Sequence, residues 1–318
     1  MRVSVVIPAH DAEATIGRAV RALAGHEVIV VDDGSRDATG ARAEEAGARV
    51  VRLETRGGPA RARNAGVRAT EAPIVVFTDA DCEPLPGFVE ALVGPLDGDP
   101  TLTGTKGAYV TEQRGLVARF VQLEYEERYA RMRRRREIDF VDTYACAYRR
   151  APFLEAGGFD ERYDRPSTED QELSFRLHER GTRFIFVPEA RTKHTHAGSL
   201  GAYLSKKAKI GTYKVETLRA HPRKTIDDAH TPLSLKAQLL LAPLAFAAIG
   251  AYPLGIPWLA LPAALFLVTS LPLVARALGR DPLLAPLVPS LVFLRALALG
   301  AGLVRGLVRP PFEPALAP

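Results

Sequence analysis

Four short apolar runs constrain the fold of the first 80 residues more than any other feature of this chain. They cover residues 3–7, 28–31, 49–53 and 74–77 and are rich in valine and isoleucine. Alanine-rich, charged segments with helical spacing separate them, at residues 12–23, 37–46 and 59–69. Strands and helices in alternation predict βαβ units, a parallel sheet and right-handed crossovers. We therefore expect an α/β domain with helices on both faces of its sheet.

Acidic residues gather where these predicted strands end. Asp11, Asp33 and the pair Asp79 and Asp81 each follow or close an apolar run. Sheets of this kind bind ligands at the carboxyl ends of their strands. If the chain stays extended after residue 77, Asp79 and Asp81 point the same way and converge on one target, which suits a hard divalent cation. The same spacing also occurs in turns and helix caps, so the pair alone leaves both readings open.

Further elements are expected after residue 110. Residues 114–137 have the pattern of a long helix that ends in a basic run containing Arg133 to Arg136. That run is either a solvated helix end or a contact with anionic lipid or a phosphorylated acceptor. Residues 142–159 predict a short strand, a helix and a turn at Gly157 and Gly158, and residues 184–187 predict another strand. Between them, Ser167 and Thr168 precede acidic residues, as is typical of a helix N-terminus.

The character of the chain changes after Lys236. Residues 237–275 contain no charge, and this stretch is long enough for two spans of about 20 residues. Residues 252–258 contain Pro, Gly and interfacial aromatic residues, so we expect a transmembrane hairpin. Basic residues before the hairpin, with Arg276 and Arg280 after it, predict that both of its ends face the cytoplasm. Residues 282–304 are either a third span, at a cost of about 2.5–3.5 kcal/mol for Arg295, or a re-entrant or interfacial segment.

Composition limits the compartment and the partners. The chain has 42 basic and 37 acidic residues, and this mild excess does not choose among nucleic acid, lipid and phosphorylated ligands. Two cysteines do not form a disulfide framework, and no secretory signal is visible, so we expect the first domain in the cytoplasm. The expected layout is an α/β domain at 1–215, a basic juxtamembrane linker at 216–236, membrane segments at 237–305 and a Pro-rich tail at 306–318.

An ordered series of motifs resembles the family 2 glycosyltransferases. The motifs are Val-Val-Ile-Pro-Ala-His-Asp from Val5, Val-Val-Asp-Asp-Gly-Ser-x-Asp from Val30, Ala62-Arg63-Asn64-x-Gly66, Asp79-Ala80-Asp81, Gly157-Gly158-Phe159-Asp160 and Thr168-Glu169-Asp170. The resemblance covers about residues 1–215. It implies the GT-A fold, with a Rossmann-like nucleotide-binding sheet, and transfer of a sugar from a nucleotide-diphosphate donor with inversion at the anomeric carbon. Members of this family commonly use UDP-sugars, so the resemblance favours a UDP-sugar as the donor.

The resemblance also implies a donor site. Asp33 matches the acid that hydrogen-bonds the nucleotide base, and Ala9 lies in the loop beside it. Asp79 matches the acid near the ribose and diphosphate, and Asp81 the acid that binds the metal, with Asp79 as a second metal residue. Mg²⁺ or Mn²⁺ would serve, because oxygen ligands do not select between them. Arg63 is suited to pairing with the phosphates, although a solvated position is an equal alternative.

Asp170 matches the general base of the family, and Glu169 is its nearest rival. In some GT-A enzymes a histidine after the base helix completes the metal site. We assign that role to His196 and leave His194 without a firm role, with a plain loop position as the alternative for both. Tyr148 and Arg149 are placed at the acceptor pocket.

The chain departs from the family pattern at two places. His10-Asp11-Ala12 replaces the usual Tyr-Asn-Glu, and Cys82 follows the metal acid, where a second Asp is common; we assign Cys82 no role. The Gln-x-x-Arg-Trp motif of processive relatives such as cellulose synthases is missing, which lowers the expectation of polymerisation.

The leading hypothesis is a glycosyltransferase anchored in the inner membrane with its catalytic domain in the cytoplasm. Its acceptor is expected to be lipid-linked or presented at the membrane, in cell-envelope or exopolysaccharide synthesis. A sugar nucleotidyltransferase is an alternative, but it needs a Gly- and Arg-rich loop after the first strand. An inactive membrane scaffold is another, although it predicts a damaged base or metal acid. Nucleic-acid binding fits least, because no aromatic stacking series accompanies the arginines. The oligomeric state is not predicted.

Overall fold

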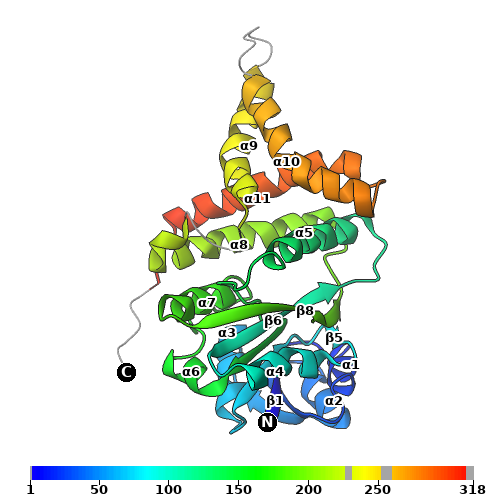
Figure 1. Ribbon diagram of the computed structural model, residues 1–318, viewed down its shortest axis with the longest axis vertical. Helices are drawn as coiled ribbons and strands as arrows, with labels where there is room; N and C mark the ends of the chain where they lie inside the picture. Colours follow the sequence, from blue (N-terminus) through cyan, green and yellow to red (C-terminus); the bar gives the residue numbers. More distant parts are fainter. Residues whose placement is uncertain (1, 226–230, 252–259, 313–318) are drawn as a thin grey trace. The chain divides into compact units, whose positions relative to one another are not determined.

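The computed structural model describes residues 2–225, 231–251 and 260–312. The chain folds into two compact units. The first, here called the sheet unit, comprises Met1–Glu112 and Tyr129–Thr195, and the second, the helical unit, comprises Gln113–Arg128 and His196–Pro318. Residues 196–215, which the sequence grouped with the first domain, therefore belong with the C-terminal helices. Figure 1 shows the elements of both units, coloured along the chain.

The sheet unit is built on an eight-stranded mixed sheet in the order β3-β2-β1-β4-β7-β6-β8-β5. Its first four strands are parallel and lie where the apolar runs predicted them: β1 (Val3–Ala9), β2 (Glu27–Asp33), β3 (Arg49–Leu53) and β4 (Ile74–Thr78). All five residues of β4 are buried, as expected for a strand flanked on both sides and covered on both faces. This half of the sheet confirms the α/β prediction.

The second half of the sheet is not parallel throughout. It is formed by β5 (Cys82–Pro84), β6 (Leu102–Val110), β7 (Ala145–Arg149) and β8 (Arg183–His194). β7 lies antiparallel between β4 and β6, whereas β8 pairs parallel with β6 and antiparallel with β5. The antiparallel pairing of β5 with β8 matters for the site, because it places Cys82, which follows β4, opposite His194, which lies far along the chain.

The helices of the sheet unit connect these strands. They are α1 (Ile16–Arg21), α2 (Thr39–Glu45), α3 (Pro59–Arg68), α4 (Phe88–Gly98), α6 (Arg150–Glu155) and α7 (Glu169–Glu179). The long helix predicted at residues 114–137 is α5 (Leu116–Met132), which both units share. It ends before the arginine run, so Arg133 to Arg136 lie beyond its last turn.

Two motifs of the sequence series interlock α3 with the loop before α7. The Asn64 side chain donates to the Phe159 carbonyl at 2.8 Å and accepts from the Phe159 amide at 2.9 Å. Gly158 has a φ of 70°, and a Cβ there would lie 2.5 Å from the Asn64 Oδ1. Only glycine therefore fits this position. These contacts hold Gly158 and Phe159, which precede α7 and its Thr-Glu-Asp motif, against α3.

The helical unit contains the first part of α5 and four long or apolar helices. These are α8 (Leu200–Ala220), α9 (Leu233–Ala251), α10 (Ala260–Arg280) and α11 (Val288–Val308). α9 and α10 correspond to the two helices of the predicted hairpin and pack side by side (Figure 1). The turn predicted at residues 252–258 lies outside the described residues.

Two helical stretches, Ala260–Arg280 and Ala285–Val308, are long and apolar enough to cross a membrane. The apolar part of α9, Leu233–Ala248, is shorter. These properties are weak evidence by themselves, because buried helices of soluble proteins share them. α11 also packs closely on α8: a Cβ at Gly302 would lie 2.0 Å from the Ala208 carbonyl oxygen.

Arg295, the charge that the sequence placed within the possible third span, has partners inside the helical unit. Its guanidinium donates to Glu124 and Gln238, each at 2.5 Å, and Lys207 lies 3.1 Å from the same glutamate. Tyr203 also donates to Glu124 at 2.9 Å. Burial raises the pKa of Glu124, but the two cations outweigh it and leave the pKa at about 2. Glu124 therefore stays ionised and compensates the arginine.

Candidate active site

The Asp79-Ala80-Asp81 motif forms a tight turn between β4 and β5. The Cys82 amide donates to the Asp79 carbonyl at 3.0 Å, which closes the turn. The extended geometry expected from the sequence is therefore wrong, and the two carboxylates contact different side chains. Asp79 accepts from Arg63 at 2.8 Å, whereas an oxygen of Asp81 lies 3.6 Å from the Nδ1 atom of His194.

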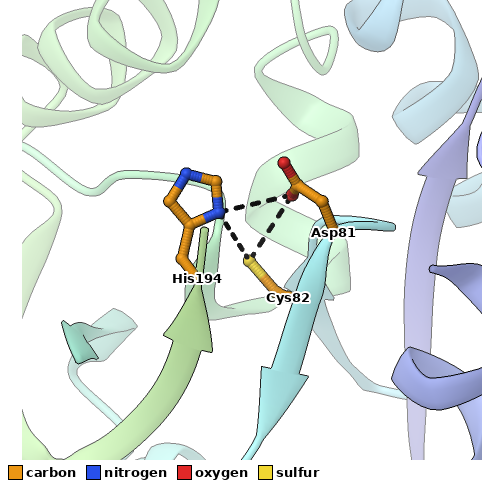
Figure 2. Close-up of side chains that lie close together, drawn as sticks. All are labelled: Asp81, Cys82 and His194. Atoms are coloured by element: carbon orange, nitrogen blue, oxygen red, sulfur yellow. Dashed lines mark hydrogen bonds and ion pairs between the residues drawn. The ribbon is translucent and has the colours of Figure 1, made fainter. Parts of the chain in front are cut away.

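The turn places Asp81 beside two residues that lie on neighbouring strands. Cys82 of β5 and His194 of β8 are directly opposite in the antiparallel register, so their side chains lie on the same face. Figure 2 shows Asp81, Cys82 and His194 pointing toward one another, and their donor atoms all lie within 4.8 Å. One carboxylate, one thiol and one imidazole are chemically able to hold a divalent metal. Asp81 is 52% exposed, so this group opens to solvent on its side.

The histidine beside Asp81 is His194, and not His196 as predicted. His196 belongs to the helical unit, where its Nε2 atom lies 3.0 Å from the Gln122 side-chain oxygen. Its ring stacks on Tyr125. The two histidines are two residues apart in sequence, but β8 ends at His194, which pairs with Cys82, and His196 lies beyond the strand. Burial and the charges of Asp79 and Asp81 raise the pKa of the Cys82 thiol, which is therefore neutral when no metal is bound.

The aromatic rings of Tyr109 and Tyr144 support the imidazole of His194. The Tyr109 ring stacks on His194 with centroids 4.4 Å apart and on Tyr144 at 3.4 Å. Tyr109 is fixed in turn because its amide donates to the Tyr129 hydroxyl at 2.8 Å. The ring plane of His194 is therefore set by its neighbours.

Arg63 of α3 joins the Asp79 turn to the start of α7. It is 4% exposed, and its two terminal nitrogens lie 2.8 Å from Asp79 and 3.0 Å from Glu169. Burial lowers the pKa of Arg63, but the two carboxylates outweigh this and raise it above its usual value. Arg63 therefore makes internal ion pairs, where the sequence suggested phosphate contact or a solvated position.

The structure distinguishes the two acids of the Thr-Glu-Asp motif. Both carboxylate oxygens of Glu169 are engaged, one by Arg63 and the other by the Ser167 amide at 2.8 Å. Asp170 accepts at Oδ1 from the Gln171 amide at 2.8 Å, and among the described residues its Oδ2 has no hydrogen-bond partner. Burial raises the pKa of Asp170 well above its usual value, and the nearby carboxylates of Glu169 and Asp142 raise it further. Of these two acids, Asp170 is therefore the one that has a carboxylate oxygen without a hydrogen bond to the described part of the chain.

Asp142, which sequence reasoning missed, lies in a segment with two buried contacts, one to Lys106 and one to α7 through its neighbour Val141. Fully buried Lys106 forms an ion pair with Asp142 and donates to the Tyr144 hydroxyl at 3.0 Å. Ser174 of α7 accepts from the Val141 amide at 3.0 Å and donates to the Asp170 carbonyl at 2.7 Å. Lys106 is the one charged residue of β6, but the sequence of that strand does not show which acid it pairs with.

Asp33 and Ala9 lie at the ends of β2 and β1, on the same edge of the sheet as Asp79. The carboxylate of Asp33 accepts from the amides of Gly57 and Gly58 at 2.8 and 2.7 Å. Ala9 is buried and pairs with the residue before Asp33 in the sheet register. The strand order β2-β1-β4 therefore brings the predicted donor-site acids to one edge of the sheet.

Tyr148 and Arg149, predicted at the acceptor pocket, have structural neighbours. Tyr148 is fully buried and packs edge-on against the rings of Phe77, Phe153 and Phe184. The Arg149 guanidinium donates to three backbone carbonyls, those of Leu96, Asp99 and Leu102. β7 lies between β4 and β6, and both side chains contact other parts of the sheet unit.

Several known proteins are similar to this chain in sequence. The model of the family described as "Glycosyl transferase family 2" matches residues 4–157. An uncharacterised glycosyltransferase of Mycobacterium bovis, Mb0553, is 32% identical over 205 residues, which are 62% of this chain and 91% of that protein. The pre-mycofactocin glycosyltransferase of Mycobacterium tuberculosis is also 32% identical, over 252 residues and 76% of this chain. This chain spans only about half of that relative, 51% of its length.

Solved structures agree on the fold. The mannosyltransferase PcManGT of Pyrobaculum calidifontis, determined with GDP-Man and Mn²⁺, superposes with a TM-score of 0.59 at 20% identity. The match covers 96% of this chain and 87% of that one. A further mycobacterial protein superposes with a TM-score of 0.51 at 25% identity over 69% of this chain and 74% of its own.

Proposed function

Because the chain belongs to glycosyltransferase family 2 and has the GT-A fold, we propose that it transfers a sugar with inversion from a nucleotide-diphosphate donor to an acceptor hydroxyl. The observation that carries the proposal is the set of acids at the carboxyl edge of the sheet, with Asp170 presenting an oxygen that has no internal partner among the described residues. Binding of GDP-Man and Mn²⁺ by the structurally similar mannosyltransferase supports a nucleotide-sugar donor here.

Asp33 is proposed to accept a hydrogen bond from the nucleotide base. Its carboxylate has about four lone-pair sites, and the amides of Gly57 and Gly58 occupy two of them. Capacity therefore remains for an N–H group of a base such as uracil. Ala9 lies at the end of the adjacent strand, beside the residue that precedes Asp33 in the sheet register, and is proposed to border the base.

Asp81 and His194 are proposed to hold a divalent metal, Mn²⁺ or Mg²⁺, next to the donor diphosphate. The donor set fits, because carboxylate and imidazole both serve such ions and the exposed side of Asp81 leaves room for phosphate oxygens. When bound, the ion offsets the negative charge that develops on the leaving nucleoside diphosphate. Asp79 contributes by positioning Arg63 and the turn.

Asp170 is proposed as the general base. The acceptor oxygen forms a bond to the anomeric carbon from the face opposite the diphosphate, the bond from that carbon to the phosphate oxygen breaks, and the hydroxyl proton passes to the Asp170 carboxylate. No protein nucleophile is required for such a single displacement. A base with a raised pKa accepts a proton more readily, and this fits the neighbours of Asp170.

Membrane association of the helical unit is the remaining part of the proposal. The two long apolar helical stretches carry many exposed leucines, including Leu261, Leu271 and Leu307. We place the chain at the cell (inner) membrane with the sheet unit in the cytoplasm. The acceptor would then be lipid-linked or presented at the membrane, as in cell-envelope or exopolysaccharide synthesis.

The full chain is expected to float with phospholipid vesicles in a density gradient and to stay bound after washing with high salt and with alkaline carbonate. Exposed apolar helices bury their side chains in the bilayer, so charge screening should not release them. Release by salt alone would indicate an electrostatic surface contact. A protein that remains monomeric without detergent and never floats would refute the membrane assignment.

Donor binding is expected to require a divalent metal and Asp81. Calorimetric titration of the full chain with a panel of nucleotide sugars in Mn²⁺ should find at least one ligand, and Asp81→Ala should weaken its affinity at least about tenfold. Asp97→Ala is the matched control, because Asp97 is exposed on α4 and makes no ion pair with the described residues. Absence of binding to every nucleotide sugar would refute the proposed function and favour an inactive scaffold.

A further inference from the structure

We propose that Cys82 is a third protein ligand of the metal at Asp81 and His194, and that the site therefore prefers thiophilic transition metals to Mg²⁺. This inference rests on the proposed function, which places a metal at that group. It assigns a role to a residue that sequence reasoning left without one.

Two independent features of the chain bring the donors together. The turn closed by the Cys82 amide and the Asp79 carbonyl positions Asp81, and the antiparallel register between β5 and β8 positions Cys82 opposite His194. Directly opposed residues of an antiparallel pair have Cβ atoms about 4.5–5.5 Å apart on one face, a separation that two metal ligands can use.

The spacing of the donor atoms matches a shared ion. The Cys82 sulfur lies 3.8 Å from an Asp81 oxygen and 4.0 Å from the His194 Nδ1 atom, and these last two atoms are 3.6 Å apart. Sulfur and nitrogen ligands of a tetrahedral zinc ion, with bonds of about 2.3 and 2.0 Å, are separated by roughly 3.5 Å. A contraction of a few tenths of an ångström would therefore bring all three donors into range.

The surroundings suit a catalytic metal site more than a packing role for the thiol. The Cys82 side chain is buried, yet its sulfur faces the polar atoms of Asp81, His194 and, at 4.0 Å, the Tyr109 hydroxyl. Tyr109 also fixes the imidazole plane by stacking. Three protein ligands with one solvent-exposed side leave a position for a substrate oxygen, which is the usual plan of a catalytic metal site.

The donor types predict the metal preference. Mg²⁺ favours oxygen ligands, whereas thiolate and imidazole favour Zn²⁺, Co²⁺ and the related soft ion Cd²⁺. When a metal–sulfur bond forms, the thiol releases its proton to solvent. A divalent ion with one carboxylate and one thiolate then forms a neutral group, which suits a half-buried position.

The test uses Co²⁺ titration of the full chain in detergent, monitored by near-ultraviolet absorption for sulfur-to-metal charge transfer. The wild-type protein should show this band, and Cys82→Ser should lose it and bind Cd²⁺ at least about tenfold more weakly, with Mg²⁺ affinity nearly unchanged. Cys146→Ser is the matched control, because Cys146 is the other cysteine of the chain and is buried in β7 outside the metal group. It should retain the band.

The outcomes separate this inference from the proposed function. If Cys82→Ser keeps the band and the Cd²⁺ affinity while Asp81→Ala and His194→Ala lose metal binding, Cys82 is not a ligand and the metal site stands. If none of the three substitutions alters metal binding, the metal site itself is wrong. Should Cys82→Ser fail to fold, ¹¹³Cd NMR of the wild-type protein decides, because one sulfur ligand moves the resonance well downfield of an oxygen and nitrogen site. A resonance without that shift would overturn the inference.

Discussion

Asp170→Asn is expected to lower the kcat of sugar transfer by about 10³-fold while leaving donor affinity within a few-fold of the wild type. The asparagine amide has the same shape but cannot take the acceptor proton. The Oδ2 atom of Asp170, which has no partner among the described residues, is the atom whose loss matters. Steady-state kinetics with an accepted donor, together with calorimetric donor binding, measure both quantities.

Glu169→Gln is the matched comparison, since the two acids are adjacent on α7. Both oxygens of Glu169 already accept hydrogen bonds, from Arg63 and from the Ser167 amide. This substitution should therefore lower the free energy of unfolding, and it should change kcat much less than Asp170→Asn does. A loss of about 10³-fold in Glu169→Gln, with activity retained in Asp170→Asn, would reverse the assignment of the base.

The pH profile gives the Asp170 experiment a second readout. Burial, with the charges of Glu169 and Asp142, raises the pKa of Asp170, and a general base must be unprotonated to act. The activity should therefore rise with pH through a limb that lies above the ordinary carboxylate range. Asp142→Asn removes a negative charge, lowers the pKa of Asp170 and should move that limb to lower pH. Asp97→Asn, on the exposed side of α4, should leave the limb in place.

Arg63→Met is expected to destabilise the sheet unit by about 3–5 kcal/mol, because it leaves Asp79 and Glu169 without their shared cation. The Arg63 and Glu169 side chains are only 5% exposed, so solvent cannot replace the lost ion pair. Urea titration followed by limited proteolysis measures the loss in the full chain without depending on Trp258, which lies outside the described residues.

Arg61→Met provides the control on the same helix. Arg61 is only partly buried and makes no ion pair among the described residues, so its substitution should change stability by less than about 0.5 kcal/mol. The Arg63→Met, Glu169→Gln double variant should lose less than the sum of the single losses, since the two residues share one interaction. If Arg63→Met kept its stability but lost donor affinity, the arginine would be a phosphate ligand.

Local pattern was sufficient for the first half of the sheet. The apolar runs that form β1, β2 and β4 are largely buried strands, and the run that forms β3 is a partly exposed edge strand. Residue type and spacing within each run were enough to predict it. The same holds for the start of α7, where acids follow a Ser-Thr pair. Motif order also predicted which acids gather, because parallel strands end at one edge of a sheet.

Register, by contrast, cannot be read from a single strand. Cys82 and His194 are more than 100 residues apart, and they face each other because β5 pairs with β8 at one particular offset. A shift by one residue would turn each side chain to the other face. The sequence therefore did not show that His194, and not His196, lies beside Asp81, and it gave no reason to connect Cys82 with either histidine. The ion pair between Lys106 and Asp142 was not predicted for a related reason, because a buried ion pair can be identified only when the positions of both partners are known.

Residue type and periodicity along the chain were enough to predict the α/β class, the four parallel strands, the acidic edge and the apolar C-terminal segments. The partners of each acid became visible only in the folded chain. Asp79 pairs with Arg63, Glu169 pairs with Arg63 and a backbone amide, and Asp170 has an oxygen without a hydrogen bond among the described residues. Chemically similar carboxylates therefore differ in their surroundings, because folding brings different parts of the chain within hydrogen-bonding distance of each.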